Sequence, residues 1–288
     1  LGKQPVAGQL VDALKRLEYR GYDSAGIATL DHGALARRRA EGKLHALEMR
    51  LIAEPLAGNI GIGHTRWATH GRPTESNAHP HATATVAVVH NGIIENFREL
   101  REKLIANGAK FGSETDTEVV AHLVTAEIGQ GKSPVEAVAA ALRQLRGAFA
   151  LAFLFAGEDD LMIGARRGSP LAIGYGQGTG KGEMYLGSDA IALAPLTSTI
   201  SYLEDGDWVV LTRNSVKIFD AHDKPVERAV VKSTATAQMV DKGNHKHFMA
   251  KEIHEQPEVV GHTLAHYIDM IHEKVALPGE LPFDWTKI

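Results

Sequence analysis

Residues 60–96 read IGIGHTRWATHGRPTESNAHPHATATVAVVHNGIIEN, and this stretch contains two predicted strands separated by a long polar loop. The apolar runs Ile60–Thr65 and Thr85–His90 have the length and composition of short strands. Polar segments follow each run, at Arg66-Trp67 and at Asn91-Gly92. Loops at the ends of strands usually carry binding and catalytic residues. The stretch therefore predicts a β-framework with candidate functional segments at both strand ends.

The sequence around this stretch extends the strand pattern upstream and a helical pattern downstream. Ala25–Leu30 and Ala34–Ala40 are two further predicted strands. Asn91-Gly92 has the composition of a tight turn, and apolar residues at helical spacing then predict a helix over 93–107 that stops at Gly108.

Two capping signals predict two more helices. Thr115–Glu118 has the spacing of a capping box, and Ser133–Glu136 repeats it with Pro134 at the first helical position. From 148 to 220 short apolar runs again predict strands. Two groups of strands flanking a helical middle favour an α+β fold, with two sheets packed against helices, over a strictly alternating parallel fold.

Composition excludes several classes of protein. The chain has 288 residues and a net charge of -4 with both signs interspersed, so no nucleic acid or anionic membrane is expected as a partner. The longest uncharged apolar run, Ala148–Ala156, is about half of what a membrane-spanning helix requires. The absence of cysteine excludes a disulfide framework, a Cys-ligated zinc site and a thiol nucleophile within these residues.

The end of the chain differs in character from the rest. Residues 232–244 (KSTATAQMVDKGN) are small and polar, as in a linker. His247–Lys274 has helical character with a break at Pro257, and some 40 residues are too few for an independent domain. We therefore expect one domain over 1–231, a linker over 232–244, and the first elements of a second domain over 245–288.

Four residues of these segments could bind a free amino acid that carries a reactive amide. A carboxylate is best bound by a guanidinium and an ammonium by a carboxylate, which Arg66 and Asp116 would supply. Attack on an amide needs hydrogen-bond donors at the developing oxyanion, which the Asn91 side chain and the Gly92 backbone could provide. Each residue also has a simpler explanation: Asn91-Gly92 as a turn, Asp116 as a favourable charge at a helix start, and Arg66 as a surface ion pair.

A cluster of histidines raises a metal site as an alternative. Five of them lie close together in the sequence, but no Asp or Glu joins them at a recognisable ligand spacing, so no metal or other cofactor is expected. A metal-dependent hydrolase remains the competing hypothesis. The histidines are His64, His70, His79, His81 and His90.

Six strings together resemble those of the glutamine–fructose-6-phosphate aminotransferase (isomerising) family, in the same order and spacing. The resemblance implies a glutamine amidotransferase domain with a four-layer αββα sandwich of the N-terminal-nucleophile (Ntn) hydrolase type, followed by a linker and a short helical stub of a truncated sugar-isomerase (SIS) domain. The strings are LEYRGYDSAG (17–26), HTRWATHG (64–71), NAHPH (77–81), VVHNGIIEN (88–96), SETDTE (113–118) and KEIHEQP (251–257).

The resemblance implies a role for each matching residue. Asn91 and Gly92 would form the oxyanion hole. Arg66 would bind the α-carboxylate of glutamine and Asp116 its α-ammonium.

Four other matching residues would lie around the substrate. Thr69 and His70 would shape a mobile loop over it. Trp67 would gate the passage of ammonia, and Arg20 would border the nucleophile and the entrance of the channel.

The resemblance also implies the reaction. In the family an N-terminal Cys, which this sequence lacks, attacks the glutamine amide, and the ammonia passes to an isomerase domain that converts fructose 6-phosphate to glucosamine 6-phosphate. The chain as written is then expected to be inactive, and the full enzyme to be a cytoplasmic homo-oligomer. The alternatives are the glutaminase domain of another class II amidotransferase and a non-catalytic glutamine-binding module.

Overall fold

The computed structural model describes residues 1–18, 23–233, 245, 248–265, 267–269 and 274–275. The chain divides into two compact units, Leu1–Met239 and Val240–Ile288. Each unit is described by itself below.

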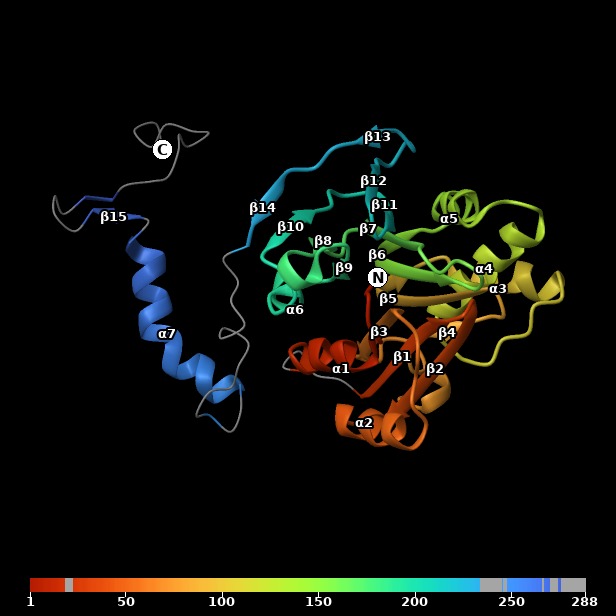
Figure 1. Ribbon diagram of the computed structural model, residues 1–288, viewed down its shortest axis with the longest axis horizontal. Coiled ribbons are helices and arrows are strands. Elements are labelled where there is room, and N and C mark those ends of the chain that lie inside the picture. The colour runs from red at the N-terminus through yellow and green to blue at the C-terminus, as the bar shows by residue number, and fades with distance from the viewer. Residues whose placement is uncertain (19–22, 234–244, 246–247, 266, 270–273, 276–288) are drawn as a thin grey trace. The chain divides into compact units, whose positions relative to one another are not determined.

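A seven-stranded antiparallel sheet forms the centre of the first unit (Figure 1). Its strand order is β13-β12-β11-β7-β6-β5-β4, and neighbouring strands pair antiparallel throughout. The strands are β4 (His81–Ala82), β5 (Val86–Ile94), β6 (Gly147–Phe155), β7 (Met162–Arg167), β11 (Trp208–Thr212), β12 (Ser215–Phe219) and β13 (Pro225–Val226).

The side chains of β6 show why this sheet is buried on both faces. Successive strand residues point to opposite faces. Leu151, Phe153 and Phe155 join one hydrophobic cluster, which includes residues of α3 (Phe97–Ala106), α4 (Thr117–Gly129) and α5 (Pro134–Leu142). The alternate residues Ala150, Ala152 and Leu154 join a second cluster on the other side. The continuous apolar run AFALAFLF therefore suits a central strand covered on both faces.

Two smaller sheets contribute to that second cluster. One has the order β2-β1-β3 and the other β14-β10-β8-β9. Their strands are β1 (Ser24–Asp31), β2 (Ala34–Glu41), β3 (Ile60–Arg66), β8 (Ala172–Tyr175), β9 (Met184–Gly187), β10 (Thr199–Tyr202) and β14 (Val230–Lys232). The strands predicted at Ala25–Leu30, Ala34–Ala40 and Ile60–Thr65 are confirmed, but the strands of the first unit form three sheets where the sequence predicted two.

Three helices pack against the small sheets. α1 (Ala7–Lys15) and α2 (Leu44–Ala53) share a hydrophobic cluster with β1, and the short α6 (Ala190–Leu193) packs with β8 and β10. Two single turns of 3-10 helix, η2 (Glu75–Asn77) and η3 (Gly178–Gly180), lie in loops.

The prediction of a tight turn at Asn91-Gly92 is wrong, because β5 runs straight through these residues to Ile94. Gly92 pairs with Phe149 of β6 and has a φ of 121°. A Cβ at this position would lie 2.0 Å from the carbonyl oxygen of Ala148. Glycine is therefore required here by a close approach inside a strand, and α3 begins at Phe97, after the strand has ended.

The described part of the second unit consists of α7 (Phe248–Ala265) and a short hairpin, β15 (Ile268–Asp269) with β16 (Lys274–Val275). The predicted break at Pro257 is wrong, since α7 continues through it; a proline removes one helical hydrogen bond and need not end a helix. Helical character up to Lys274 is also wrong, because the hairpin follows. No helix among the described residues is long and apolar enough to cross a membrane.

Candidate functional site

A cavity of about 530 Å³ opens where β3, β5 and the start of α4 meet. Its lining brings together seven of the eight residues proposed from the sequence, although they come from three separate segments. The eighth, Arg20, lies outside the described residues. The seven are Arg66, Trp67, Thr69, His70, Asn91, Gly92 and Asp116.

Arg66 is buried at the end of β3, with 3% of its surface exposed. Its Nη2 donates hydrogen bonds to the carbonyl oxygens of His70 and, at 3.1 Å, Gly71, while Nη1 donates to that of Arg72 at 3.3 Å. Asp23 lies 3.6 Å from Nη1. Burial lowers the pKa of Arg66, and the carboxylates of Asp23 and Asp116 oppose that shift. The guanidinium therefore organises the loop after β3 and is more than a surface ion pair.

Asp116 is buried directly before α4, but its side chain makes no capping hydrogen bond to the helix. Its Oδ2 accepts a hydrogen bond of 2.8 Å from the backbone N–H of Ile94, at the end of β5. His90 Nδ1 lies 3.9 Å from the same oxygen. The carboxylate thus joins α4 to β5 beside the cavity. A residue that served only to stabilise the helix dipole would not need this hydrogen bond to β5.

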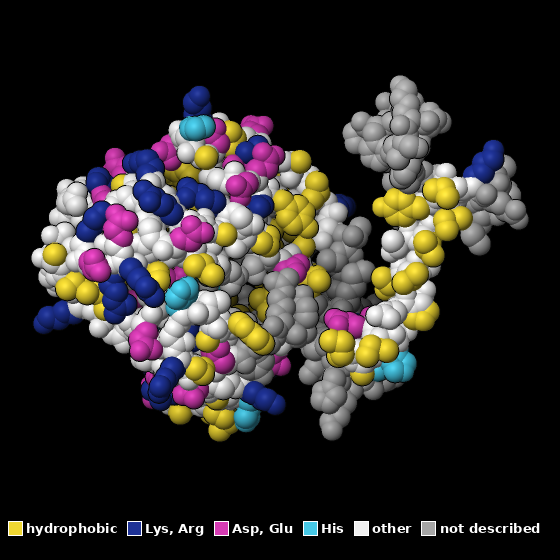
Figure 2. All heavy atoms as spheres, turned by 180° about the vertical axis from the view of Figure 1, so that it is seen from behind, with side chains coloured by type: hydrophobic (Ala, Val, Ile, Leu, Met, Phe, Trp, Pro, Cys, Tyr) yellow, Lys and Arg dark blue, Asp and Glu magenta, His cyan; other side chains and the backbone are white. Residues whose placement is uncertain are grey.

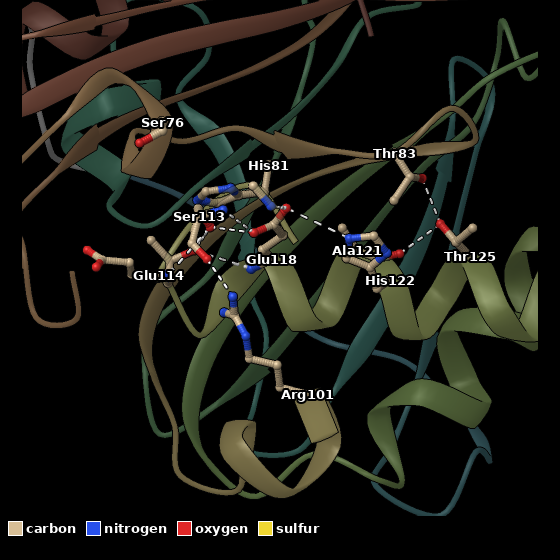
Figure 3. Close-up of polar contacts among 12 residues, drawn as sticks. Ser76, His81, Thr83, Arg101, Ser113, Glu114, Glu118, Ala121, His122 and Thr125 are labelled. Carbon is tan, nitrogen blue, oxygen red and sulfur yellow. Dashed lines mark hydrogen bonds and ion pairs between the residues drawn. The ribbon is translucent and has the colours of Figure 1, made fainter. Parts of the chain in front are cut away.

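Glu118 fixes the loop that leads into Asp116 (Figure 3). Its carboxylate accepts hydrogen bonds from the backbone N–H groups of Gly112 at 2.8 Å and Ser113 at 2.7 Å, and from Ser113 Oγ at 2.6 Å. Burial raises the pKa of Glu118, but bonds from His122, Gly112 and Ser113 outweigh this and lower the pKa to about 2. The predicted capping box is therefore only half formed: Glu118 N–H donates to Thr115 Oγ1 at 3.4 Å, but the carboxylate bonds further back along the loop.

Asn91 and Gly92 lie at the edge of the cavity on β5. Asn91 Oδ1 lies 2.7 Å from Nε2 of the buried His64 on β3. The contact joins the seven-stranded sheet to the three-stranded sheet. Within the described part of the chain, the Asn91 side chain thus has a hydrogen-bond partner at Oδ1 and none at Nδ2.

Four buried histidines surround these residues. Burial lowers the pKa of His64 and of His90 to about 4 and that of His81 to about 3, and it lowers the pKa of His79 well below the ordinary value. All four are consequently neutral near pH 7. His79 Nε2 and His90 Nδ1 lie 2.8 and 2.9 Å from Thr117 Oγ1.

The geometry does not support the metal-site hypothesis. Within the described ranges, no three His, Cys, Asp or Glu side chains are arranged to hold a metal ion. The sequence pattern suggests these histidines only as metal ligands and does not predict their contacts with Thr117 and Asn91. The available signal was that His64 and His90 both belong to strands next to the polar segments.

Three residues form the outer part of the site. The Trp67 side chain is 67% exposed, and Thr69 is exposed beside it. The His70 ring packs edge-on against Phe97, with ring centroids 5.1 Å apart. The backbone N–H of Ala68 donates to Asp23, so the first turn of this loop is anchored close to Arg66.

Comparison with known proteins identifies the sequence family. Residues 64–195 match a family model described as a glutamine amidotransferase domain. The chain is 69% identical over its whole length to glutamine–fructose-6-phosphate aminotransferase (isomerizing) of Bradyrhizobium diazoefficiens and of Brucella abortus, and 64% identical to that of Mesorhizobium japonicum. Over its whole length the chain is therefore similar to members of this aminotransferase family. It spans 47% of each of these relatives and therefore represents about half of a family member's length.

Solved structures agree on the fold. The glutamine phosphoribosylpyrophosphate amidotransferase of B. subtilis superimposes with a TM-score of 0.65 at 24% identity, covering 76% of this chain and 48% of that one. A structure described as the allosteric regulatory enzyme of purine biosynthesis gives a TM-score of 0.62, also at 24% identity. The chain thus shares the mixed α/β fold of these two enzymes.

Proposed function

We propose that the cavity binds L-glutamine and that this chain is the glutamine-hydrolysing part of a glutamine–fructose-6-phosphate aminotransferase. The observation that carries the proposal is the convergence of Arg66, Asp116 and Asn91-Gly92 on one cavity. These groups offer a cation, an anion and hydrogen-bond donors, which are the three complements of an amino acid whose amide is under attack. Within this proposal the fold is the four-layer αββα sandwich expected from the sequence.

Asp116 takes the α-ammonium of glutamine and Arg66 its α-carboxylate. The guanidinium is now bonded to the carbonyl oxygens of residues 70–72, and a carboxylate is a stronger acceptor than these carbonyls. When glutamine binds, its α-carboxylate would then replace the loop carbonyl oxygens as the hydrogen-bond partner of the Arg66 guanidinium. Thr69 and His70, on the same loop, would move with it and cover the substrate.

The nucleophile of the proposed reaction must come from outside these 288 residues, because they contain no cysteine. Leu1 lines the cavity, and its backbone exchanges hydrogen bonds of 3.0 and 3.1 Å with Met184 at the start of β9. Gly2 N–H also donates to the Asn59 carbonyl, 2.7 Å away and next to β3. Residues 1–288 alone would then bind glutamine without hydrolysing it.

The remaining steps are those that the resemblance to the aminotransferase family implies. Ammonia released at the cavity passes Trp67 on its way to a sugar-isomerase domain that begins near residue 245 and acts on fructose 6-phosphate. The complete protein would be a cytoplasmic homo-oligomer held together through that domain. The segments 1–231, 232–244 and 245–288 then correspond to the glutaminase domain, a linker and the start of the isomerase domain.

A product assay on the complete protein tests the proposal. With glutamine and fructose 6-phosphate, glutamate and amino sugar should form in equal amounts. Glutamine binding without glutamate release would instead indicate a non-catalytic binding module. Glutamate release that responds to a different acceptor would indicate another class II amidotransferase.

A further inference from the structure

The contact between His64 and Asn91 joins two sheets at the point where the proposed reaction takes place. His64 lies on β3 and Asn91 on β5, and their Nε2 and Oδ1 atoms are 2.7 Å apart. His64 is 8% exposed and lines the cavity together with Asn91. The contact is therefore shielded from solvent on the histidine side.

The direction of this hydrogen bond follows from the chemistry of the two groups. Burial lowers the pKa of His64 to about 4, so the ring is neutral at pH 7 and carries a single N–H. An amide oxygen can only accept, so the proton is on Nε2. Nδ1 then carries no proton, and no described residue meets the usual distance and angle limits for a hydrogen bond to it, although the backbone of His90 is close enough to raise the pKa of the ring.

Only one of the two polar atoms of the Asn91 amide takes part in this hydrogen bond. Oδ1 is held by His64, whereas Nδ2 makes no hydrogen bond within the described part of the chain. An asparagine amide can turn over, which exchanges a donor for an acceptor at the same place. An acceptor facing a developing oxyanion would repel it, so the orientation of this amide matters more than its presence.

The His64 ring is itself held in place. The His79 ring lies against it, with centroids 4.4 Å apart, and His79 Nε2 is 2.8 Å from Thr117 Oγ1. Thr117 follows Asp116 at the start of α4 and also contacts His90 Nδ1 at 2.9 Å. A chain of neutral, buried groups thus connects the amide of Asn91 to the segment that carries Asp116.

We propose that His64 is a positioning residue that donates a hydrogen bond to Asn91 Oδ1 and thereby turns the Asn91 NH₂ group towards the carbonyl of the glutamine amide. The assignment rests on the proposed function, since it gives Asn91 a substrate to face. His64 does not touch the reacting atoms and acts only through Asn91.

Kinetics of the complete protein test the link between the two residues. His64→Leu removes the donor at similar volume and should lower kcat for glutamine hydrolysis at least tenfold, because loss of one oxyanion donor typically costs about 10²–10³ in kcat, while KM changes less than about threefold. His64→Gln keeps an N–H donor and should restore most of the loss. In an Asn91→Ala background His64→Leu should have almost no further effect, since both changes remove the same interaction. Equal losses in the two backgrounds, or a loss mainly in KM, would overturn the proposal.

Nitrogen NMR of the 288-residue chain separates this proposal from the proposed function. The His64 ring should show its proton on Nε2, and the Asn91 side-chain resonances should shift in His64→Leu and return in His64→Gln. A proton on Nδ1, or Asn91 resonances indifferent to His64→Leu, would overturn the positioning role even if the protein hydrolyses glutamine. Conversely, a protein that shows the expected spectra but releases no glutamate would contradict the proposed function and leave the contact itself established.

Discussion

At the scale of single residues, the site depends on groups whose partners are backbone atoms. Arg66 donates to three loop carbonyls, Asp116 accepts from a strand N–H, and Gly92 lies against the Ala148 carbonyl. A side-chain substitution at the partner residue does not remove the backbone atom that makes the contact. Single changes at these three positions should therefore have large and separable effects.

Arg66→Ala should weaken the use of glutamine strongly while leaving the use of free ammonia by the complete protein nearly unchanged. Loss of one partner of a desolvated charge pair costs about 2–5 kcal/mol, which corresponds to at least a thirtyfold rise in the glutamine requirement. Arg66→Lys, which keeps the charge but not the two-pronged geometry, should fall in between. Amino-sugar formation with each nitrogen source measures both effects. An equal loss with glutamine and ammonia would show that Arg66 is needed for the fold and not for glutamine.

Gly92→Ala should destabilise the domain by at least about 3 kcal/mol, because the new Cβ would overlap the Ala148 carbonyl in addition to the strain of a positive φ. Gly108→Ala is the matched control: its φ of 90° is also positive, but nothing lies within 4 Å of the added atom. That control should lose only about 1–2 kcal/mol. Urea unfolding of the three proteins gives the comparison. Equal losses would mean that the strand can shift away from the overlap.

At the scale of secondary-structure elements, the start of α4 shows what the sequence can and cannot predict. The 115–118 spacing correctly predicts a helix start, because capping patterns are local. It does not predict that Glu118 bonds to Gly112 and Ser113, since the path of the preceding loop depends on packing against distant elements. The Asn91-Gly92 turn fails for a similar reason: a glycine with positive φ suits both a turn and a close approach inside a sheet, and only the partner strand decides.

Acid unfolding should reveal the contribution of Glu118. A carboxyl whose folded pKa of about 2 lies below its ordinary value of 4.5 stabilises the fold fully above pH 4.5, and loses that contribution as the pH falls towards 2. Glu118→Gln should therefore be less stable than the wild type at pH 7, and the difference should shrink at pH 3. The buried histidines destabilise both proteins on acidification, because burial lowers their pKa values. The Glu118 charge raises the pKa of His81, so the contribution of His81 does not cancel completely in the difference. Urea midpoints at the two pH values test this, and a constant difference would contradict it.

At the scale of the whole first unit, the site lies where different sheets meet. Arg66 and His64 come from the three-stranded sheet, and Asn91 comes from the seven-stranded sheet. The sequence identifies Arg66 and Asn91 individually, because their types suit an amino-acid substrate, whereas it suggests His64 only as a metal ligand. Their convergence depends on the apolar cluster between the sheets, which no local pattern specifies.

The second unit presents a different surface. Large hydrophobic side chains lie exposed along α7, as Figure 2 shows, among them Met249, Ile253 and Val259. On the first unit, the face seen in that view carries both signs of charge interspersed, in keeping with the absence of a nucleic-acid footprint in the sequence.

Whether the cavity beside Asp116 binds glutamine as a substrate can be measured as glutamate release from L-glutamine by the complete protein. The wild type should release glutamate. Asp116→Asn keeps the size of the side chain but removes the charge that faces the α-ammonium, and it should reduce kcat/KM at least about thirtyfold. Glutamate release that is absent from the wild type, or unchanged in Asp116→Asn, would contradict the account.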